Sequence, residues 1–142
     1  MLSARVLIAV VILAAAAQSA ADSGPWTGVG LPEWTEPELA MPIAVRTVGR
    51  SEFSSAHLIR LAGAEEPHFH DRHDLAITVL RGRSVLHFST HDVELGAGDT
   101  AFIPRGHYHW AENVGDEASV VFAVFAPSFD GQDRRPADGA AR

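Results

Sequence analysis

The 142-residue sequence has no cysteine and no lysine, and each absence removes a class of chemistry. Without cysteine, the chain forms no disulfide, offers no thiolate to a metal and carries no thiol nucleophile. Without lysine, a Schiff-base enzyme and a lysine general base are excluded. The 11 basic residues are therefore all arginines, which are outnumbered by 18 acidic residues and leave a formal net charge of −7. This acidic balance argues against nucleic acid or an anionic membrane surface as a partner.

Only one long apolar run is present, and it lies at the amino end. Arg5 precedes the run Val6–Ala17, and small residues lead up to Ala21, directly before Asp22. A basic start, an apolar centre and a small-residue cleavage site are typical of a secretory signal. The alternatives are a cytoplasmic helix and an uncleaved anchor, for which roughly 20 apolar residues would be needed. We predict a signal peptide at residues 1–21, a periplasmic or secreted protein, and no membrane contact once the signal is cleaved.

Two segments flanking the main domain have the composition of loops. Residues 22–42 are rich in proline and glycine and include Trp26 and Trp34. They are interpreted as an extended arm that packs on its own domain or on a second subunit. Residues 128–142 are small and polar, so we expect a C-terminal tail that is disordered from Gln132 onward. The length in between favours one domain at residues 43–127.

Within that domain, short β-rich runs alternate with turn signals, and no helical period emerges. The expected strands are Ile43–Val48, Ala56–Leu61, Leu75–Leu80, Ser84–Ser89, Asp92–Leu95, Thr100–Ile103, His107–Ala111 and Ser119–Phe125. Leu75, Ile77 and Val79 alternate with smaller or polar residues, which places them on the inward face. The pattern predicts an all-β sandwich or barrel.

Histidines concentrate in two short windows of this domain. His68 and His70 are two residues apart, so a strand places both imidazoles on one face. Pro104 and Gly106 predict a tight reversal, because proline fixes φ and glycine permits a positive φ. The reversal brings His109 back toward the first pair, where its ring supplies a third nitrogen from another strand. Neutral imidazole is a common metal ligand, so the two windows predict a metal site.

The two windows resemble the two sequence motifs of the cupin superfamily. The second motif is matched at every fixed position, by Gly98, Pro104, Gly106, His109 and Asn113. The first motif is matched by His68, His70 and Gly82, whereas Gly63 lies one residue closer to His68 than the pattern asks. The resemblance covers roughly Ile43 to Pro127. It implies a small cupin with a double-stranded β-helix, or jelly-roll barrel, and a metal in the mouth of the barrel held by the three motif histidines.

One position departs from the cupin pattern. The glutamate ligand of the family falls on Leu75, whose side chain cannot bind a metal. His73 shares the inward parity of Leu75 and is one candidate for a fourth ligand, and Asp74 is another if a bulge shifts the register. The third alternative leaves the three histidines alone. Histidines with a carboxylate suit Fe or Mn, and an all-imidazole set suits Zn, Cu, Fe or Ni, so the expected cofactor is a divalent transition metal of open identity.

The resemblance implies a dioxygenase-like oxidation or an isomerase- or lyase-type reaction on a small molecule. The alternative is a non-catalytic module that binds a sugar or small metabolite, with a metal that is structural or absent. A weaker alternative is metal sequestration, with His73 and His107 as additional ligands. Glu65 and Glu66 would serve as acid–base groups only if they curl over the site. A homodimer is expected because cupins often dimerise and the tryptophan-bearing arm needs a surface.

Overall fold

The computed structural model describes residue 31 and residues 33–137. The predicted signal peptide and most of the predicted arm lie outside these residues. The described chain is almost entirely β-structure, with one short helix. The elements are α1 (Glu36–Leu39), β1 (Ile43–Arg50), β2 (Ser55–Leu61), β3 (His68–Phe69), β4 (Asp74–Arg81), β5 (Arg83–Phe88), β6 (Asp92–Gly96), β7 (Thr100–Ile103), β8 (His109–Asn113), β9 (Ser119–Ala126) and β10 (Arg135–Pro136). No helix in the described ranges is long and apolar enough to cross a membrane.

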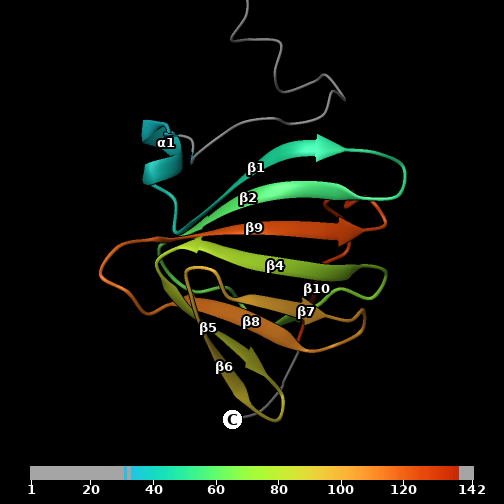
Figure 1. The fold of residues 1–142 in the computed structure, drawn as a ribbon. Helices are drawn as coiled ribbons and strands as arrows, with labels where there is room; N and C mark the ends of the chain where they lie inside the picture. Colours follow the sequence, from blue (N-terminus) through green and yellow to red (C-terminus); the bar gives the residue numbers. More distant parts are fainter. Residues whose placement is uncertain (1–30, 32, 138–142) are drawn as a thin grey trace, which may run out of the picture.

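The strands form two antiparallel sheets that face each other (Figure 1). One sheet has the order β1-β2-β9-β4-β7 and the other the order β10-β3-β8-β5-β6. Strands far apart in the sequence are neighbours, as where β9 lies between β2 and β4. Repeated crossing between two sheets is the arrangement of a jelly-roll barrel, so the predicted fold class is confirmed.

Each of the expected strands is present, with small differences at the ends. The largest difference is in β8, which begins at His109 rather than His107. The two-residue strands β3 and β10 and the helix α1 were not predicted. These elements are too short to show a period, which explains why the alternation of apolar residues did not indicate them.

The core lies between the two sheets, where alternate side chains point inward. Leu75 and Val79 of β4 are buried, as their parity predicted, and Ile77 lines the same interior. They pack with Phe125 of β9 and with Leu86 of the opposite sheet. Burying one such side chain contributes about 1.5–3 kcal/mol, so this layer holds the two sheets together.

Gly82 carries the chain from the first sheet to the second, between β4 and β5. Its φ is +83°, a left-handed conformation that favours glycine. A Cβ at this position would lie 2.8 Å from the Cα of Ser119, at the start of β9. The turn therefore needs glycine for both backbone conformation and space.

The C-terminal segment packs on the barrel, contrary to the disorder predicted from Gln132 onward. Arg135 and Pro136 form β10 and pair with Phe69 and His68 of β3. Asp133 is only 6 % exposed. The prediction was wrong for residues 132–137 because Asp133 and Arg135 form specific polar contacts with the barrel, even though most of this segment stays exposed. Residues 138–142 lie outside the described part of the chain.

The described end of the predicted arm also contacts the barrel. The guanidinium carbon of Arg46 on β1 lies 4.9 Å from the ring centroid of Trp34. Arg46 also donates to Glu38 of α1, with an Nη2 to Oε2 distance of 2.5 Å. The arm is thus held on its own barrel in this structure, whereas Trp26 lies outside the described residues.

Candidate metal centre

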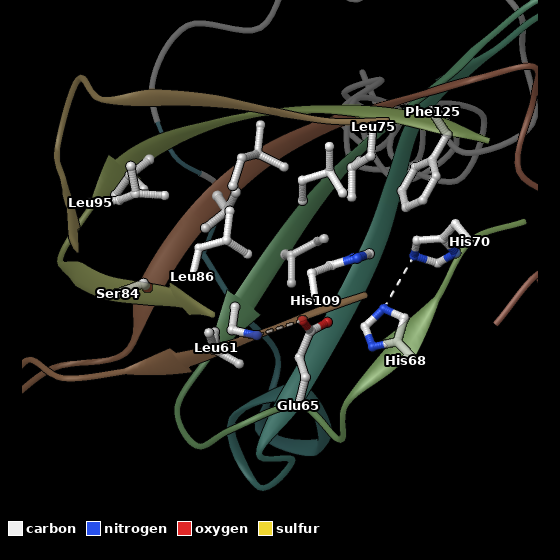
Figure 2. Close-up of a pocket in the computed structure, with 16 residues that line it drawn as sticks. Leu61, Glu65, His68, His70, Leu75, Ser84, Leu86, Leu95, His109 and Phe125 are labelled. Carbon is white, nitrogen blue, oxygen red and sulfur yellow. Dashed lines mark hydrogen bonds between the residues drawn. The ribbon is translucent and has the colours of Figure 1, made fainter. Parts of the chain in front are cut away.

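Three histidines predicted to converge do so at one end of the barrel interior. His68 and His70 come from β3 and the residue following it, and His109 is the first residue of β8. His68 and His109 are direct partners across the β3–β8 pair. One ring nitrogen from each of the three lies within 4.8 Å of the others. The Nε2 atoms of His68 and His70 are 3.3 Å apart (Figure 2).

Each of the three rings contacts a backbone carbonyl through Nδ1. His68 Nδ1 lies 2.8 Å from the carbonyl oxygen of Glu66, and His109 Nδ1 lies 2.9 Å from that of His107. His70 Nδ1 contacts the carbonyl oxygen of Asp133. A carbonyl only accepts, so we assign the proton of each neutral ring to Nδ1 and a lone pair to Nε2. For His68 the 2.8 Å contact with Glu66 decides this assignment over the longer, 3.3 Å contact of Nδ1 with Nη2 of Arg134. These tautomers leave three Nε2 lone pairs for one ion.

Burial keeps these rings in the neutral form that binds metal. Removal from water lowers the pKa of His68 to about 3 and that of His109 to about 4, although hydrogen bonds to Glu66 and His107 oppose the shift. The pKa of His70 is lowered for the same reason. A metal therefore meets little competition from protons for these ligands near neutral pH.

The Pro104–Gly106 reversal positions His109 as predicted. Gly106 has φ of +75°, and its backbone N–H donates to the carbonyl oxygen of His70 at 2.7 Å. The turn is thereby fastened to the loop after β3. The chain then returns through His107, which is exposed, and enters β8 at His109.

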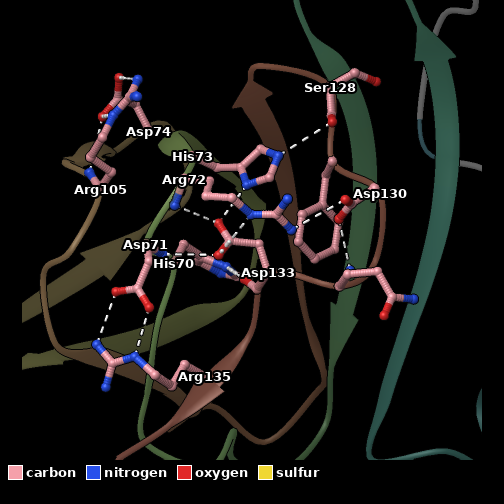
Figure 3. Close-up of polar contacts among 12 residues, drawn as sticks. His70, Asp71, Arg72, His73, Asp74, Arg105, Ser128, Asp130, Asp133 and Arg135 are labelled. Atoms are coloured by element: carbon pink, nitrogen blue, oxygen red, sulfur yellow. Dashed lines mark hydrogen bonds and ion pairs between the residues drawn. The ribbon is translucent and has the colours of Figure 1, made fainter.

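His73 is buried close to this centre, but the structure does not bring it into the group. Its Nδ1 lies 2.5 Å from Oδ2 of Asp133, and its Nε2 lies 3.3 Å from the carbonyl oxygen of Ser128 (Figure 3). Both ring nitrogens are thus occupied by the C-terminal segment. The inward parity of His73 correctly predicted that its side chain is buried. The ring is nevertheless bound by Asp133 and not directed to the other histidines.

Neither Asp74 nor Leu75 supplies a fourth ligand to the three-histidine group. Asp74 points away from the interior and binds the guanidinium of Arg105, with Oδ2 to Nη2 at 2.8 Å. These hydrogen bonds lower the pKa of Asp74 to about 2. Leu75 lines the cavity and is 6 % exposed. Of the three alternatives from the sequence, the geometry favours the three histidines alone.

Asp133 and the backbone of its segment are the part of the site that sequence reasoning missed. The Asp133 carboxylate accepts the backbone N–H groups of Asp71 at 3.1 Å and Arg72 at 2.8 Å, in addition to His73 (Figure 3). Burial raises its pKa, but the hydrogen bonds outweigh burial and bring the pKa to about 2. The sequence predicted a disordered tail here, and no local pattern marks a contact some 60 residues away.

A largely apolar cavity of about 70 Å³ opens beside the three histidines. Glu65 is the one carboxylate among the described residues that line it. The apolar lining comes from both sheets and comprises Ile59, Leu61, Leu75, Ile77, Val79, Leu86, Leu95, Ile103, Ala111, Val121 and Phe125. Three neutral imidazoles with room beside them suit Zn, Cu, Fe or Ni with a coordination position left open for a ligand.

Sequence comparisons place this architecture among known proteins. Residues 58–125 match the Cupin domain family. An uncharacterized protein of Aquifex aeolicus (strain VF5) is 43% identical over 79 residues, which is 56% of this chain and 64% of that protein. Germin-like protein 2-4 of Oryza sativa subsp. japonica is 33% identical over 98 residues, which is 66% of this chain and 42% of that protein. The chain therefore spans less than two thirds of the length of either curated relative.

Solved structures share the fold. KdgF from Halomonas sp. superposes with a TM-score of 0.60 at 25% identity, covering 70% of this chain and 87% of that one. The Streptomyces nucleoside dehydratase Pac13 superposes with a TM-score of 0.58 at 21% identity, covering 67% of this chain and 78% of that one. An RmlC-like cupin from Shewanella frigidimarina gives a TM-score of 0.57 at 23% identity, with 63% and 80% covered. These likenesses concern the arrangement of the strands.

Proposed function

The chain belongs to the cupin superfamily, and on this premise we propose that it is an exported metal-dependent protein that acts on a small molecule in its barrel. The metal is a divalent transition ion held by Nε2 of His68, His70 and His109. The observation that carries the proposal is the convergence of the three rings, because one nitrogen of each lies within 4.8 Å of the others while each Nδ1 contacts a backbone carbonyl.

The chain's own residues supply the rest of the site. The backbone of the C-terminal segment orients His70, and the turn at Gly106 holds the loop that carries it. The apolar lining accommodates the body of a small ligand, because the cavity volume of about 70 Å³ is room for several water molecules that such a ligand would displace. A bound metal would supply Lewis-acid or redox chemistry at one end of this space.

The proposal is tested by metal analysis of the purified protein. The protein is loaded in turn with Fe, Mn, Zn, Cu and Ni, desalted, and assayed for metal by mass spectrometry. We expect one metal per wild-type chain and none in a His68→Ala/His109→Ala variant. His91→Ala is the matched control, because His91 is exposed in the β5–β6 turn and should leave the stoichiometry unchanged. Absence of stoichiometric metal from the wild type for all five ions would end the proposal.

A non-catalytic binding module is the second candidate, and the apolar Leu75 in place of a carboxylate ligand favours it. The two candidates differ in what a bound metal does. A structural metal should raise Tm strongly without exchanging, whereas a catalytic centre should accept an added ligand, seen as a change in the visible spectrum of the Co²⁺ protein. Export and a homodimer remain proposals, tested by cell fractionation with amino-terminal sequencing, which should show cleavage before Asp22, and by sedimentation.

A further inference from the structure

The cavity beside the three histidines contains two more polar side chains among the described residues that line it, Glu65 and Ser84. Ser84 is satisfied within the protein, because its Oγ lies 2.7 Å from the Oγ of Ser119. If the histidines hold a metal, their lone pairs are also engaged. Glu65 is then the acid–base group that remains to meet a ligand in this space.

Glu65 is fixed in place by β8, the strand that carries His109. The backbone N–H of Glu65 donates to the carbonyl oxygen of Ala111 at 2.8 Å, and the N–H of Ala111 donates to Oε2 of Glu65 at 3.0 Å. Ala111 lies two residues beyond His109 on the strand, so the carboxyl is tied to the strand close to this ligand. Figure 2 shows the Glu65 carboxyl pointing into the cavity, on the same side as His68 and His109.

One carboxyl oxygen of Glu65 remains available to a ligand. The second oxygen, Oε1, has no hydrogen bond to any described residue. Burial raises the pKa of Glu65, although the charge of Arg134 and the hydrogen bond from Ala111 oppose the shift. A carboxylate with a raised pKa is a stronger base than a carboxylate in water, which supports proton transfer at this oxygen.

We propose, resting on the metal-dependent function above, that Glu65 is the catalytic base of this cavity and that its substrates are small carbonyl compounds with a hydrogen on the carbon next to the carbonyl group. The Glu65 carboxylate takes a proton from the carbon next to the carbonyl group. The electron pair of that C–H bond forms the C=C bond of an enolate, and the carbonyl oxygen takes the negative charge. Return of the proton to a carbon restores the carbonyl compound or its isomer, so the step needs no oxidant or reductant.

A buried carboxylate facing the cavity favours isomerisation or elimination over oxidation. Oxidation by a metal centre does not call for a buried carboxylate facing the substrate, whereas isomerisation and elimination next to a carbonyl both begin with removal of such a proton. The volume of the cavity favours a small substrate. Hydroxyacetone is a probe that meets both requirements.

The test is hydrogen–deuterium exchange of hydroxyacetone in D2O, followed by NMR with the Zn-loaded and Ni-loaded protein. We expect the wild type to accelerate exchange at the carbons beside the carbonyl and Glu65→Gln to lose at least about 100-fold of that rate, which is typical for removal of a positioned base. Glu65→Asp, which keeps the carboxylate, should retain part of it. Glu94→Gln is the matched control, because Glu94 is exposed on β6 and should match the wild type.

A second readout does not depend on turnover. Addition of hydroxyacetone to the Zn-loaded protein should shift the backbone amide resonance of Ala111, whose N–H contacts the Glu65 carboxyl, and Glu65→Gln should reduce that shift. Equal exchange by the wild type and a folded, metal-loaded Glu65→Gln variant would overturn the assignment of Glu65. Metal binding without any exchange would also overturn it while leaving the metal-binding proposal standing, and failure to bind metal would overturn both.

Discussion

Replacing Asp133 by asparagine keeps the size of the side chain but removes the carboxylate that ties the loop after β3 to the C-terminal segment. In the wild-type protein, the two oxygens accept the N–H groups of Asp71, Arg72 and the His73 ring at 3.1, 2.8 and 2.5 Å. An amide offers one oxygen and one NH2 group in their place. At least one of these donors therefore loses its acceptor in a site where Asp133 is 6 % exposed.

The magnitude follows from these contacts. An unpaired buried donor costs roughly 1–3 kcal/mol, and a hydrogen bond to a charged group contributes roughly 1.5–3 kcal/mol. We expect Asp133→Asn to lower the free energy of unfolding of the metal-free protein by about 3 kcal/mol at pH 7, and Tm by roughly 10–20 °C. Urea denaturation followed by circular dichroism measures the first quantity. Asp130→Asn is the control, because Asp130 is exposed, and should cost less than about 1 kcal/mol.

The effect should depend on pH in a defined direction. The folded-state pKa of Asp133 is about 2, below its ordinary value of 3.8. A carboxyl whose pKa is lower in the folded than in the unfolded state stabilises the fold at pH values above the unfolded pKa. That contribution is lost as pH falls through the folded pKa. For Asp133 the loss amounts to about 2 kcal/mol between pH 4 and pH 2. The difference between wild type and Asp133→Asn should therefore shrink toward pH 2. A difference below about 1 kcal/mol at pH 7, or one that stays constant down to pH 2, would refute this reasoning.

Three further predictions concern the centre and the fold. The pKa values of His68 and His109 are about 3 and about 4 in the folded protein, against 6.5 in the unfolded chain. Metal affinity should therefore change little between pH 8 and pH 5.5, whereas the metal-free fold should lose stability as pH falls below 6.5. Ni²⁺ titrations and denaturation across this range measure the two quantities, and half-release of metal near pH 6.5 would contradict the burial argument. Leu75→Glu should lower the free energy of unfolding of the metal-free protein by about 2–4 kcal/mol, because it buries a carboxylate. On addition of Mn²⁺, the Tm of this variant should rise more than that of the wild type. An equal rise would mean that the side chain at position 75 does not reach the ion. Gly82→Ala should lower stability by at least about 2 kcal/mol, since its Cβ would lie 2.8 Å from the Cα of Ser119 at a φ of +83°; a Tm within a degree of the wild type would show that the turn can move.

The parts of the site that could be predicted depend on local spacing. His68 and His70 converge because extended backbone alternates its side chains, and His109 returns because Pro104 and Gly106 form the turn between β7 and β8, which brings His109 opposite His68. Leu75 was placed inside for the same reason, and it is buried there. Alternation in one strand and a turn between two strands are properties of neighbouring residues, so the sequence reveals them.

The parts that could not be predicted depend on contacts between distant segments. Asp133 lies in a turn whose composition is that of a solvated loop, and its contacts with His70 and His73 accompany the pairing of β10 with β3. Glu65 was a conditional candidate whose position depended on how the segment before β3 runs, and its hydrogen bonds with Ala111 settle that question. Parity placed His73 inside correctly, but parity says nothing about which neighbour occupies its ring nitrogens.

The most direct test of the central claim is a crystal structure of the Zn-loaded protein with anomalous diffraction at the zinc edge. The account predicts one ion bound to Nε2 of His68, His70 and His109, at about 2.0–2.1 Å from each nitrogen, with the three Nδ1 atoms still on their carbonyls. An ion bound through an Nδ1 atom, an ion held by His73 and Asp133 instead, or an empty centre in the presence of excess zinc would contradict it.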